Sequence, residues 1–267
     1  MLEIFHYDFM VRAFEAGLAV AVIAPLIGIF LVVRRYSLMA DTLAHVSFAG
    51  IAIGIFLGVA NPVYAALVAS VVAALGIDRL RGGKKIFGES VLAIFLSGSL
   101  AIAVIVVSLA HGFNVNLLSF LFGSVATVSG GDVALILGMG VLVVASVAMF
   151  YKELFFIAFD EELAAASGLK VRVLNALMMV LAAVTVSLSI RVVGVLLIGA
   201  LMVIPVISAM QFGRGFRDTL LGAIILSVSA VVLGLFGSYY LDIPSGGAIV
   251  ATALVLFLGS LISGKTS

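Results

Sequence analysis

The sequence contains no cysteine, and only 10% of its 267 residues are charged. Without cysteine, the chain forms neither disulfides nor thiolate metal sites. The formal net charge of +1 provides no basic field that would hold phosphates, so we exclude nucleic acid as a partner. The N-terminal stretch MLEIFHYDFMVRAFEAG lacks a basic start and a small-residue cleavage site, so we expect no signal peptide.

Motifs of hydrolytic enzymes are also missing. The zinc-protease pattern H-E-x-x-H does not occur, and GESVL at 88–92 lacks the spacing of the serine elbow G-x-S-x-G. We therefore argue against an intramembrane enzyme. We also expect no phosphate-binding loop in this chain, so any ATP hydrolysis belongs to a separate chain.

Apolar residues dominate what remains, at 64% of the chain with a mean hydropathy of +1.39. A soluble domain has about 45–50% apolar residues, so this excess requires lipid as the solvent. We predict an all-α, multi-pass protein of the cell (cytoplasmic) membrane with a single transmembrane domain over residues 1–267. Helices of about 20 apolar residues cross a membrane. The breaks between apolar runs predict nine spans, at 11–33, 37–59, 62–77, 89–109, 132–150, 171–190, 192–210, 217–237 and 247–263.

The positively charged residues predict how these spans are oriented, because cytoplasmic loops retain lysine and arginine. With nine spans and the N-terminus outside, only Arg12 and Arg191 fall on the outer side, and the C-terminus is cytoplasmic. The weakest break is at 187–194, and without it the count is eight. We expect Arg191 to anchor to lipid headgroups, and 113–132 to form a re-entrant segment over the pore mouth.

The stretch MADTLAHVSF at 39–48 places an ionisable pair inside the second predicted span. Asp41 and His45 are four residues apart, so their side chains share one face of a helix. Ionisable groups inside a membrane mark transport paths by default, and carboxylate and imidazole both bind first-row divalent metals. Two ligands make half of a tetrahedral site, which a second helix or a symmetry mate would complete. Two structural roles are the alternatives: Asp41 and His45 pair with each other, or Asp41 caps the start of the helix.

Two further features accompany this pair. Gly50, Gly54 and Gly58 form a ridge of small residues in the same span, which we predict to pack closely against another helix. Glu89 opens the fourth span from the cytoplasmic side, where an acid suits the positive end of the helix dipole. A minor role of Glu89 in metal exit stays open.

The cytoplasmic segment 151–175 contains a short helix of its own. Asp160 is a good N-cap, Glu161 and Glu162 suit a first turn, and Gly168 ends the helix. The apolar side chains of the segment are Phe155, Phe156, Phe159 and Leu163. Such a helix either inserts into a groove on a partner protein or rests on lipid.

Here the sequence resembles a known family. DEELAAASGLKV at 160–171 resembles the coupling-helix segment of ABC-importer permeases for divalent metals. Four other stretches resemble the same family: RRYSLMADTLAHVSFAGIAIG at 34–54, LLSFLFGSVATVS at 117–129, VVGVLLIGALMVIPVISA at 192–209 and DIPSGGAIV at 242–250. The matches extend over nearly the whole chain and are specific together.

The resemblance implies a homodimeric permease, which receives metal from an extracytoplasmic binding protein and is driven by a separate dimer of ATP-binding subunits. The coupling segment, about 153–168, would dock on that ATPase through Phe159, Asp160, Glu161, Glu162, Leu163, Ala164 and Gly168. The family's metal residues correspond to Asp41 and His45, and two copies would supply four ligands, enough for a transported zinc ion. The resemblance implies no permanently bound cofactor.

The identity of the metal and of the transport class leaves alternatives. The motif DTLAH resembles that of zinc permeases, whereas manganese permeases of the family more often have the motif DAxSH. Sites made of aspartate and histidine nevertheless accept zinc, manganese or iron. A secondary, ion-coupled metal transporter would use the same pair but needs no docking helix at 151–175. A permease for metal chelates such as haem or siderophores is the third alternative, although those relatives are usually longer and a free-ion path better explains the ligand pair.

Overall fold

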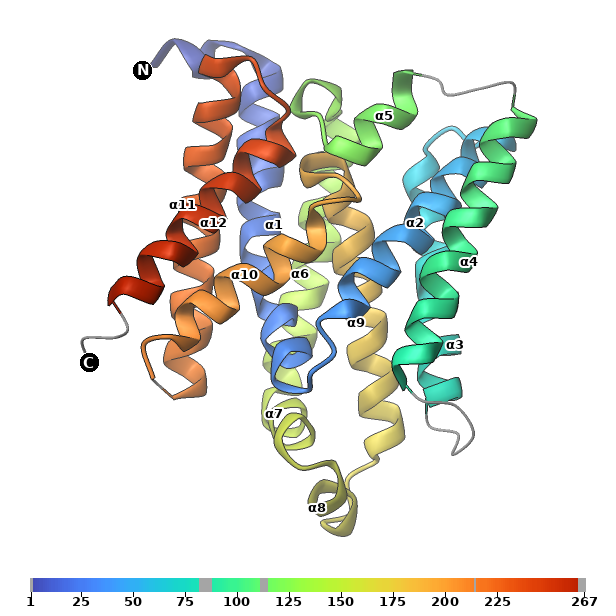
Figure 1. The fold of residues 1–267 in the computed structure, drawn as a ribbon, viewed down its shortest axis with the longest axis vertical. Helices are drawn as coiled ribbons and strands as arrows, with labels where there is room; N and C mark the ends of the chain where they lie inside the picture. Colours follow the sequence, from blue (N-terminus) through green and yellow to red (C-terminus); the bar gives the residue numbers. More distant parts are fainter. Residues whose placement is uncertain (1, 82–87, 111–114, 214, 264–267) are drawn as a thin grey trace.

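The computed structural model describes residues 2–81, 88–110, 115–213 and 215–263, and these form helices and turns without a strand (Figure 1). The predicted all-α class is therefore confirmed. In chain order the helices are η1 (Leu2–His6), α1 (Asp8–Val33), α2 (Leu38–Phe56), α3 (Pro62–Arg81), α4 (Gly88–Leu109), α5 (Val115–Phe122), η2 (Val125–Thr127), α6 (Gly130–Met149), α7 (Tyr151–Phe159), α8 (Glu161–Ala166), α9 (Val171–Val193), α10 (Ile198–Met210), α11 (Phe216–Leu241) and α12 (Ser245–Ser263).

Eight of the described helices are long and apolar enough to cross a membrane, namely α1, α2, α3, α4, α6, α9, α11 and α12. The predicted seventh span corresponds to α10, which has only 13 residues. The nine predicted spans therefore become eight helices of spanning length and one shorter apolar helix. In Figure 1 this shorter helix runs obliquely across the bundle.

The break between the predicted sixth and seventh spans lies at Gly194 and not at Arg191. Gly194 has a φ of +88°, a backbone conformation that favours glycine. The next residue, Val195, donates its N–H to the carbonyl of Phe120 in α5, at 2.9 Å. Residues 194–197 therefore form a turn that is held by α5, and α10 begins only after it.

The centre of the bundle consists of α1, α2 and α9, in each of which 72% of the most apolar 18-residue window is buried. The corresponding share is only 28–33% in α3, α4, α6 and α11. Large apolar side chains of these outer helices are exposed, among them Ile94, Val104, Leu142 and Leu233. Extended apolar surfaces of this kind mark membrane contact, so the outer helices face lipid.

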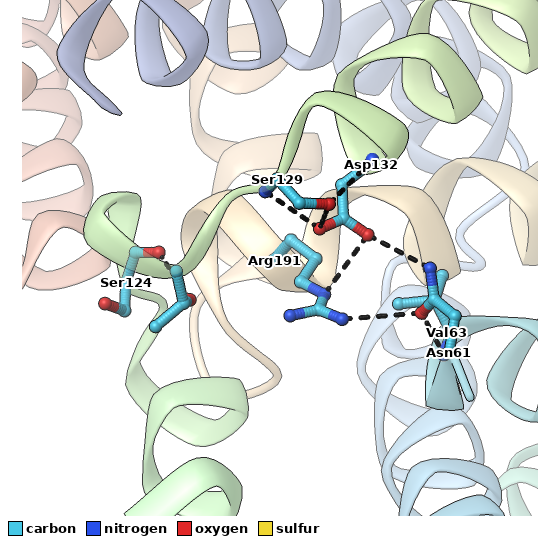
Figure 2. Close-up of polar contacts among 7 residues, drawn as sticks. Asn61, Val63, Ser124, Ser129, Asp132 and Arg191 are labelled. Atoms are coloured by element: carbon cyan, nitrogen blue, oxygen red, sulfur yellow. Dashed lines mark hydrogen bonds and ion pairs between the residues drawn. The ribbon is translucent and has the colours of Figure 1, made fainter. Parts of the chain in front are cut away.

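Arg191 belongs to a polar cluster at the end of the bundle where α5 lies, opposite α7 and α8 (Figure 1). Its Nε lies 3.6 Å from Asp132 Oδ1, and its Nη2 donates to Asn61 Oδ1 at 3.4 Å, as Figure 2 shows. The guanidinium lies 4.6 Å from the ring centroid of Phe120. The Arg191 side chain is 17% exposed. The expected headgroup anchor is therefore a largely buried ion pair, because α9 ends next to the start of α6.

The carboxylate of Asp132 also fixes the start of α6. It accepts hydrogen bonds from the Ser129 N–H at 3.0 Å and the Ser129 hydroxyl at 2.7 Å, while the Asp132 N–H donates to Ser129 Oγ at 3.2 Å. Asn61 donates to the other carboxylate oxygen at 3.2 Å. The expected re-entrant segment is thus a short helix, α5, followed by η2 and this cap; its first two residues, 113–114, lie outside the described residues.

The sequence also contains the residue pattern of a phosphate-binding loop, G-x-x-x-x-G-K-T, in GSLISGKT at 259–266. A working loop of this kind lies between a strand and a helix, where its backbone N–H groups are free to cradle phosphates. Residues 259–263 instead form the last turn of α12. The first five residues of the pattern are therefore helical and form no such loop; Lys265 and its neighbours lie outside the described residues.

We expect Asp132→Ala to lower the free energy of unfolding by about 3 kcal/mol, because it leaves the Arg191 cation without its carboxylate and removes the α6 cap. Thermal unfolding in detergent measures this change. Asp8→Ala is the matched control, since Asp8 is an exposed acid in the first turn of α1. Equal melting temperatures for the two variants would contradict the role of the cluster.

Candidate functional site

Asp41 and His45 lie on successive turns of α2, and both side chains are partly exposed. The N-cap of α2 is Ser37, whose side chain makes no cap hydrogen bond. Asp41 is therefore within the helix and does not occupy the cap position. This position excludes the alternative that Asp41 caps the helix.

The carboxylate of Asp41 lies directly against the backbone of Gly199 in α10. A Cβ at position 199 would overlap Asp41 Oδ1, so glycine leaves the space in which the carboxylate lies. His45 contributes an unused nitrogen, because its Nδ1 is buried and has no hydrogen-bond partner among the described residues. Together these residues provide a carboxylate and an imidazole nitrogen on one helix face, next to α10.

This helix face is open around the ionisable pair and closed further along α2. Leu38, three residues before Asp41 on the same side, is 57% exposed. Ala49 and Ala52 lie on the same side after His45 but are only 5% and 2% exposed. The pair is thus accessible at the end of α2 that is connected to α1, the end nearer to α7 and α8 in Figure 1.

The part of one chain that the structure describes contains no complete metal site. Among the described residues no group of three or more histidine, cysteine or acidic side chains is close enough to hold a metal ion. Glu89 is exposed in the first turn of α4, and no hydrogen bond or ion pair of the described residues connects it with Asp41 or His45. His6 lies in η1 at the opposite end of the bundle (Figure 1), and His111 lies outside the described residues.

The predicted glycine ridge divides into two parts. Cβ atoms at Gly50 and Gly54 would come within 3 Å of α3, against Ala65 and Ala66 among others, so these glycines allow a close helix contact. Gly58 follows the end of α2 with a φ of +70°, and a Cβ added there would meet no atom of the described residues within 4 Å. It terminates the helix and takes no part in the contact.

The segment 151–175, which the sequence predicts to be cytoplasmic, forms two helices that project from the bundle, α7 and α8 (Figure 1). The local prediction for α8 is confirmed: Asp160 accepts the Leu163 N–H at 2.8 Å as N-cap, and Gly168 follows the helix with a φ of +85°. Phe159, at the end of α7, is 60% exposed and Leu163 is 54% exposed, while Ala164 is completely buried. Glu162 is exposed. The docking surface therefore excludes two members of the predicted set: Ala164, which is buried, and Glu161, whose carboxylate is bonded to Arg34 and Asn175 of the same chain.

Two residues near these sites were not singled out from the sequence. Gly199 lies in a span rich in small and branched residues, and its spacing alone does not show that it contacts Asp41. In the sequence, Arg34 is only one of the positive charges that predict the orientation of the spans, yet its side chain is 5% exposed and bonded to Glu161. A positive charge four residues before the first residue of the ligand-bearing helix was the available signal.

Comparison with known proteins agrees with this architecture. The family model described as "ABC 3 transport family" matches residues 6–264. Manganese import system permease protein ScaB of Streptococcus gordonii is 30% identical over 254 residues, covering 95% of this chain and 91% of the relative. High-affinity zinc uptake system membrane protein ZnuB of Haemophilus influenzae is 30% identical over 256 residues, covering 96% and 97%.

A solved structure gives the same result for the fold. PsaBC from Streptococcus pneumoniae in complex with Fab superimposes with a TM-score of 0.86 at 29% sequence identity. The match covers 97% of this chain and 92% of that chain. The chain therefore belongs to the ABC 3 transport family, as a multi-pass membrane permease subunit of an ABC metal importer and not an enzyme.

Proposed function

We propose that the chain passes zinc across the cell membrane, and that two copies hold the ion in transit between their Asp41 and His45 side chains. The observation that carries this proposal is the pair itself. The two side chains share a partly open face of α2, and His45 Nδ1 has no hydrogen-bond partner among the described residues. Polar groups held away from water are costly without a partner, and a transported divalent cation provides one.

The argument for two copies rests on the number of ligands. Each chain offers one carboxylate and one imidazole on α2, and the described residues add no third ligand nearby. A two-fold axis brings the same surface of both copies together, which doubles the set to two carboxylates and two imidazoles. Four such ligands match the tetrahedral preference of zinc.

The choice of zinc rests on ligand chemistry and on the motif DTLAH at 41–45. The two relatives described above are named for manganese import and for zinc uptake, so similarity alone does not choose between these metals. Manganese prefers six ligands that are rich in oxygen, whereas a set of two imidazoles and two carboxylates suits zinc. Manganese and iron remain the alternative cargoes that an uptake measurement distinguishes.

The partners follow from the exposed cytoplasmic helices. We assign α7 and α8 as the docking element for a dimer of ATP-binding subunits, because Phe159 and Leu163 present apolar side chains on a projection of the bundle. Such a projecting helix fits a groove on a partner. An extracytoplasmic binding protein would deliver the metal at the opposite end. ATP binding by the partner would then move the coupling segment and switch access to Asp41 and His45 from outside to inside.

We expect Asp41→Asn and His45→Ala each to reduce zinc uptake by more than about tenfold, because loss of a ligand leaves the ion incompletely coordinated. Uptake by cells that carry the full transporter measures this, with zinc and manganese compared and expression checked. Asp218→Asn and His6→Ala are controls for removing an acid and a histidine elsewhere. Normal zinc uptake by both α2 variants would contradict the site, and wild-type uptake of manganese in preference to zinc would contradict the metal.

Gly199→Ala tests the same site without removing a ligand. The added methyl group would overlap the Asp41 carboxylate, so we expect zinc uptake to fall by about tenfold while both ligands remain. Gly98→Ala is the matched control, because Gly98 lies within α4 and has open space around its Cβ position. If the two glycine variants transport equally well, the position of the Asp41 carboxylate does not matter for transport.

The docking assignment predicts that Leu163→Asp and Phe159→Asp weaken binding of the ATP-binding subunit by at least about tenfold, since each places a charge in an apolar contact. Co-purification of that subunit with the permease measures this. Phe212→Asp is the control, because Phe212 is a 42% exposed phenylalanine in the turn between α10 and α11. Wild-type recovery of the subunit with both α7–α8 variants would refute the assignment.

A further inference from the structure

Five side chains at the cytoplasmic end of the bundle form a connected cluster, which we call the clasp: Arg34, Tyr36, Arg81, Glu161 and Asn175. They come from the end of α1, the turn before α2, the end of α3, the first turn of α8 and the start of α9. The clasp lines a cavity of about 280 Å³ together with Asp78, Gly88 and Met179. It therefore connects α8 with the turn before α2, and α2 is the helix that contains Asp41 and His45.

Glu161 connects α8 with two other elements. Its Oε2 accepts a hydrogen bond from Arg34 Nη2 at 2.6 Å, and its Oε1 accepts one from Asn175 Nδ2 at 2.8 Å. Asn175 in turn accepts a bond from Arg34 Nη1 at 2.7 Å. The three side chains thus form a closed triangle, in which each member contacts both others.

The two charged members of the triangle differ in exposure, and this difference determines which of them is affected more when the ion pair is broken. The Arg34 side chain is 5% exposed, whereas that of Glu161 is 48% exposed. The exposed Glu161 gains little from the bond, whereas the buried guanidinium of Arg34 would lose the carboxylate with which it forms an ion pair. Asp78 lines the same cavity and interacts with Arg34 only at longer range. Loss of the Glu161 charge therefore acts mainly on Arg34, at the end of α1.

Tyr36 extends the clasp toward α3. The guanidinium of Arg81 lies 3.6 Å from the ring centroid of Tyr36, and that of Arg34 lies 5.0 Å from it. Both distances are within the range of a cation–π contact. The tyrosine side chain is thus positioned by two arginines, and α2 begins two residues later, at Leu38.

The turn between α1 and α2 is short and tightly bonded. Arg35 has a φ of +57°, which is uncommon for a residue with a side chain, and the Tyr36 N–H donates to the Leu31 carbonyl at 2.7 Å. Only three residues separate Arg34 from the first residue of α2, and Asp41 is in its first turn. A displacement of Arg34 is therefore passed to the start of α2, since the turn has little slack to absorb it.

We propose that Arg34 and Glu161 are positioning residues for transport, and that the clasp transmits displacement of α8 to the metal-bearing end of α2. This inference rests on the proposed function, because α8 is the element that docks on the ATP-binding subunit. The coupling runs through one ion pair, from Glu161 to Arg34, and then through the turn to Asp41. Phe159 and Leu163 bind the partner, whereas Glu161 faces the bundle.

The first experiment measures zinc uptake and ATP hydrolysis together, with the complete transporter in proteoliposomes. We expect Glu161→Gln to retain the ATP-binding subunit and its hydrolysis, and to lower the zinc transported per ATP by about fivefold or more. The double variant Arg34→Gln, Glu161→Gln should transport better than Glu161→Gln alone, because no buried cation is left uncompensated. Asp218→Asn is the matched control, an exposed acid in the first turn of α11.

A second measurement follows α2 directly and needs no metal. The chain has no cysteine, so Leu38→Cys introduces a single thiol at an exposed position at the start of α2. We expect binding of a non-hydrolysable ATP analogue to the partner to change the rate of thiol labelling. Glu161→Gln should abolish that change, whereas Asp218→Asn should keep it.

The outcomes separate the clasp from the proposed function. Unchanged zinc per ATP in Glu161→Gln, or loss of the ATP-binding subunit from that variant, would overturn the clasp. So would a labelling rate that is insensitive to nucleotide in the wild type, or a change that persists in Glu161→Gln. If the wild-type complex takes up no divalent metal, the proposed cargo is wrong, while the labelling experiment still decides on the clasp.

Discussion

The cost of holding an ionised group away from water determines where the charges of this chain lie. Arg34 and Arg191 each have a carboxylate partner, Glu161 and Asp132 respectively, and these two pairs are at opposite ends of the bundle (Figure 1). Each pair joins segments that are far apart in the sequence. The ion pairs therefore hold the ends of the helices together, while apolar packing of α1, α2 and α9 fills the centre.

The features that depend on local sequence could be predicted. Long apolar runs identify the spanning helices because lipid requires uninterrupted apolar segments. The cap at Asp160 and the glycine after α8 identify that helix because they act within a few residues. The four-residue spacing of Asp41 and His45 places them on one face of a helix for the same reason.

The features that depend on contacts between distant segments could not be predicted. Arg34 and Glu161 are 127 positions apart, and neither position shows from the sequence that it has a charged partner. Arg191 fits a headgroup anchor equally well until α6 places Asp132 beside it. The short α10 results from a turn that is bonded to α5, and α5 is identified only when the chain is folded. In each of these cases the deciding partner comes from another part of the chain.

Under the proposed function, the incomplete ligand set of one chain is itself a mechanism. A transported ion must be bound firmly enough to enter and weakly enough to leave. If its ligands come from two copies of α2, the affinity depends on the separation of two helices, because metal–ligand distances are fixed within a few tenths of an ångström. No ligand then has to rotate or titrate to release the ion; a small displacement of α2 is enough. Gly199 beside Asp41 and the clasp at Arg34 both make contacts close to the start of α2. Control of this helix position is therefore equivalent to control of metal affinity.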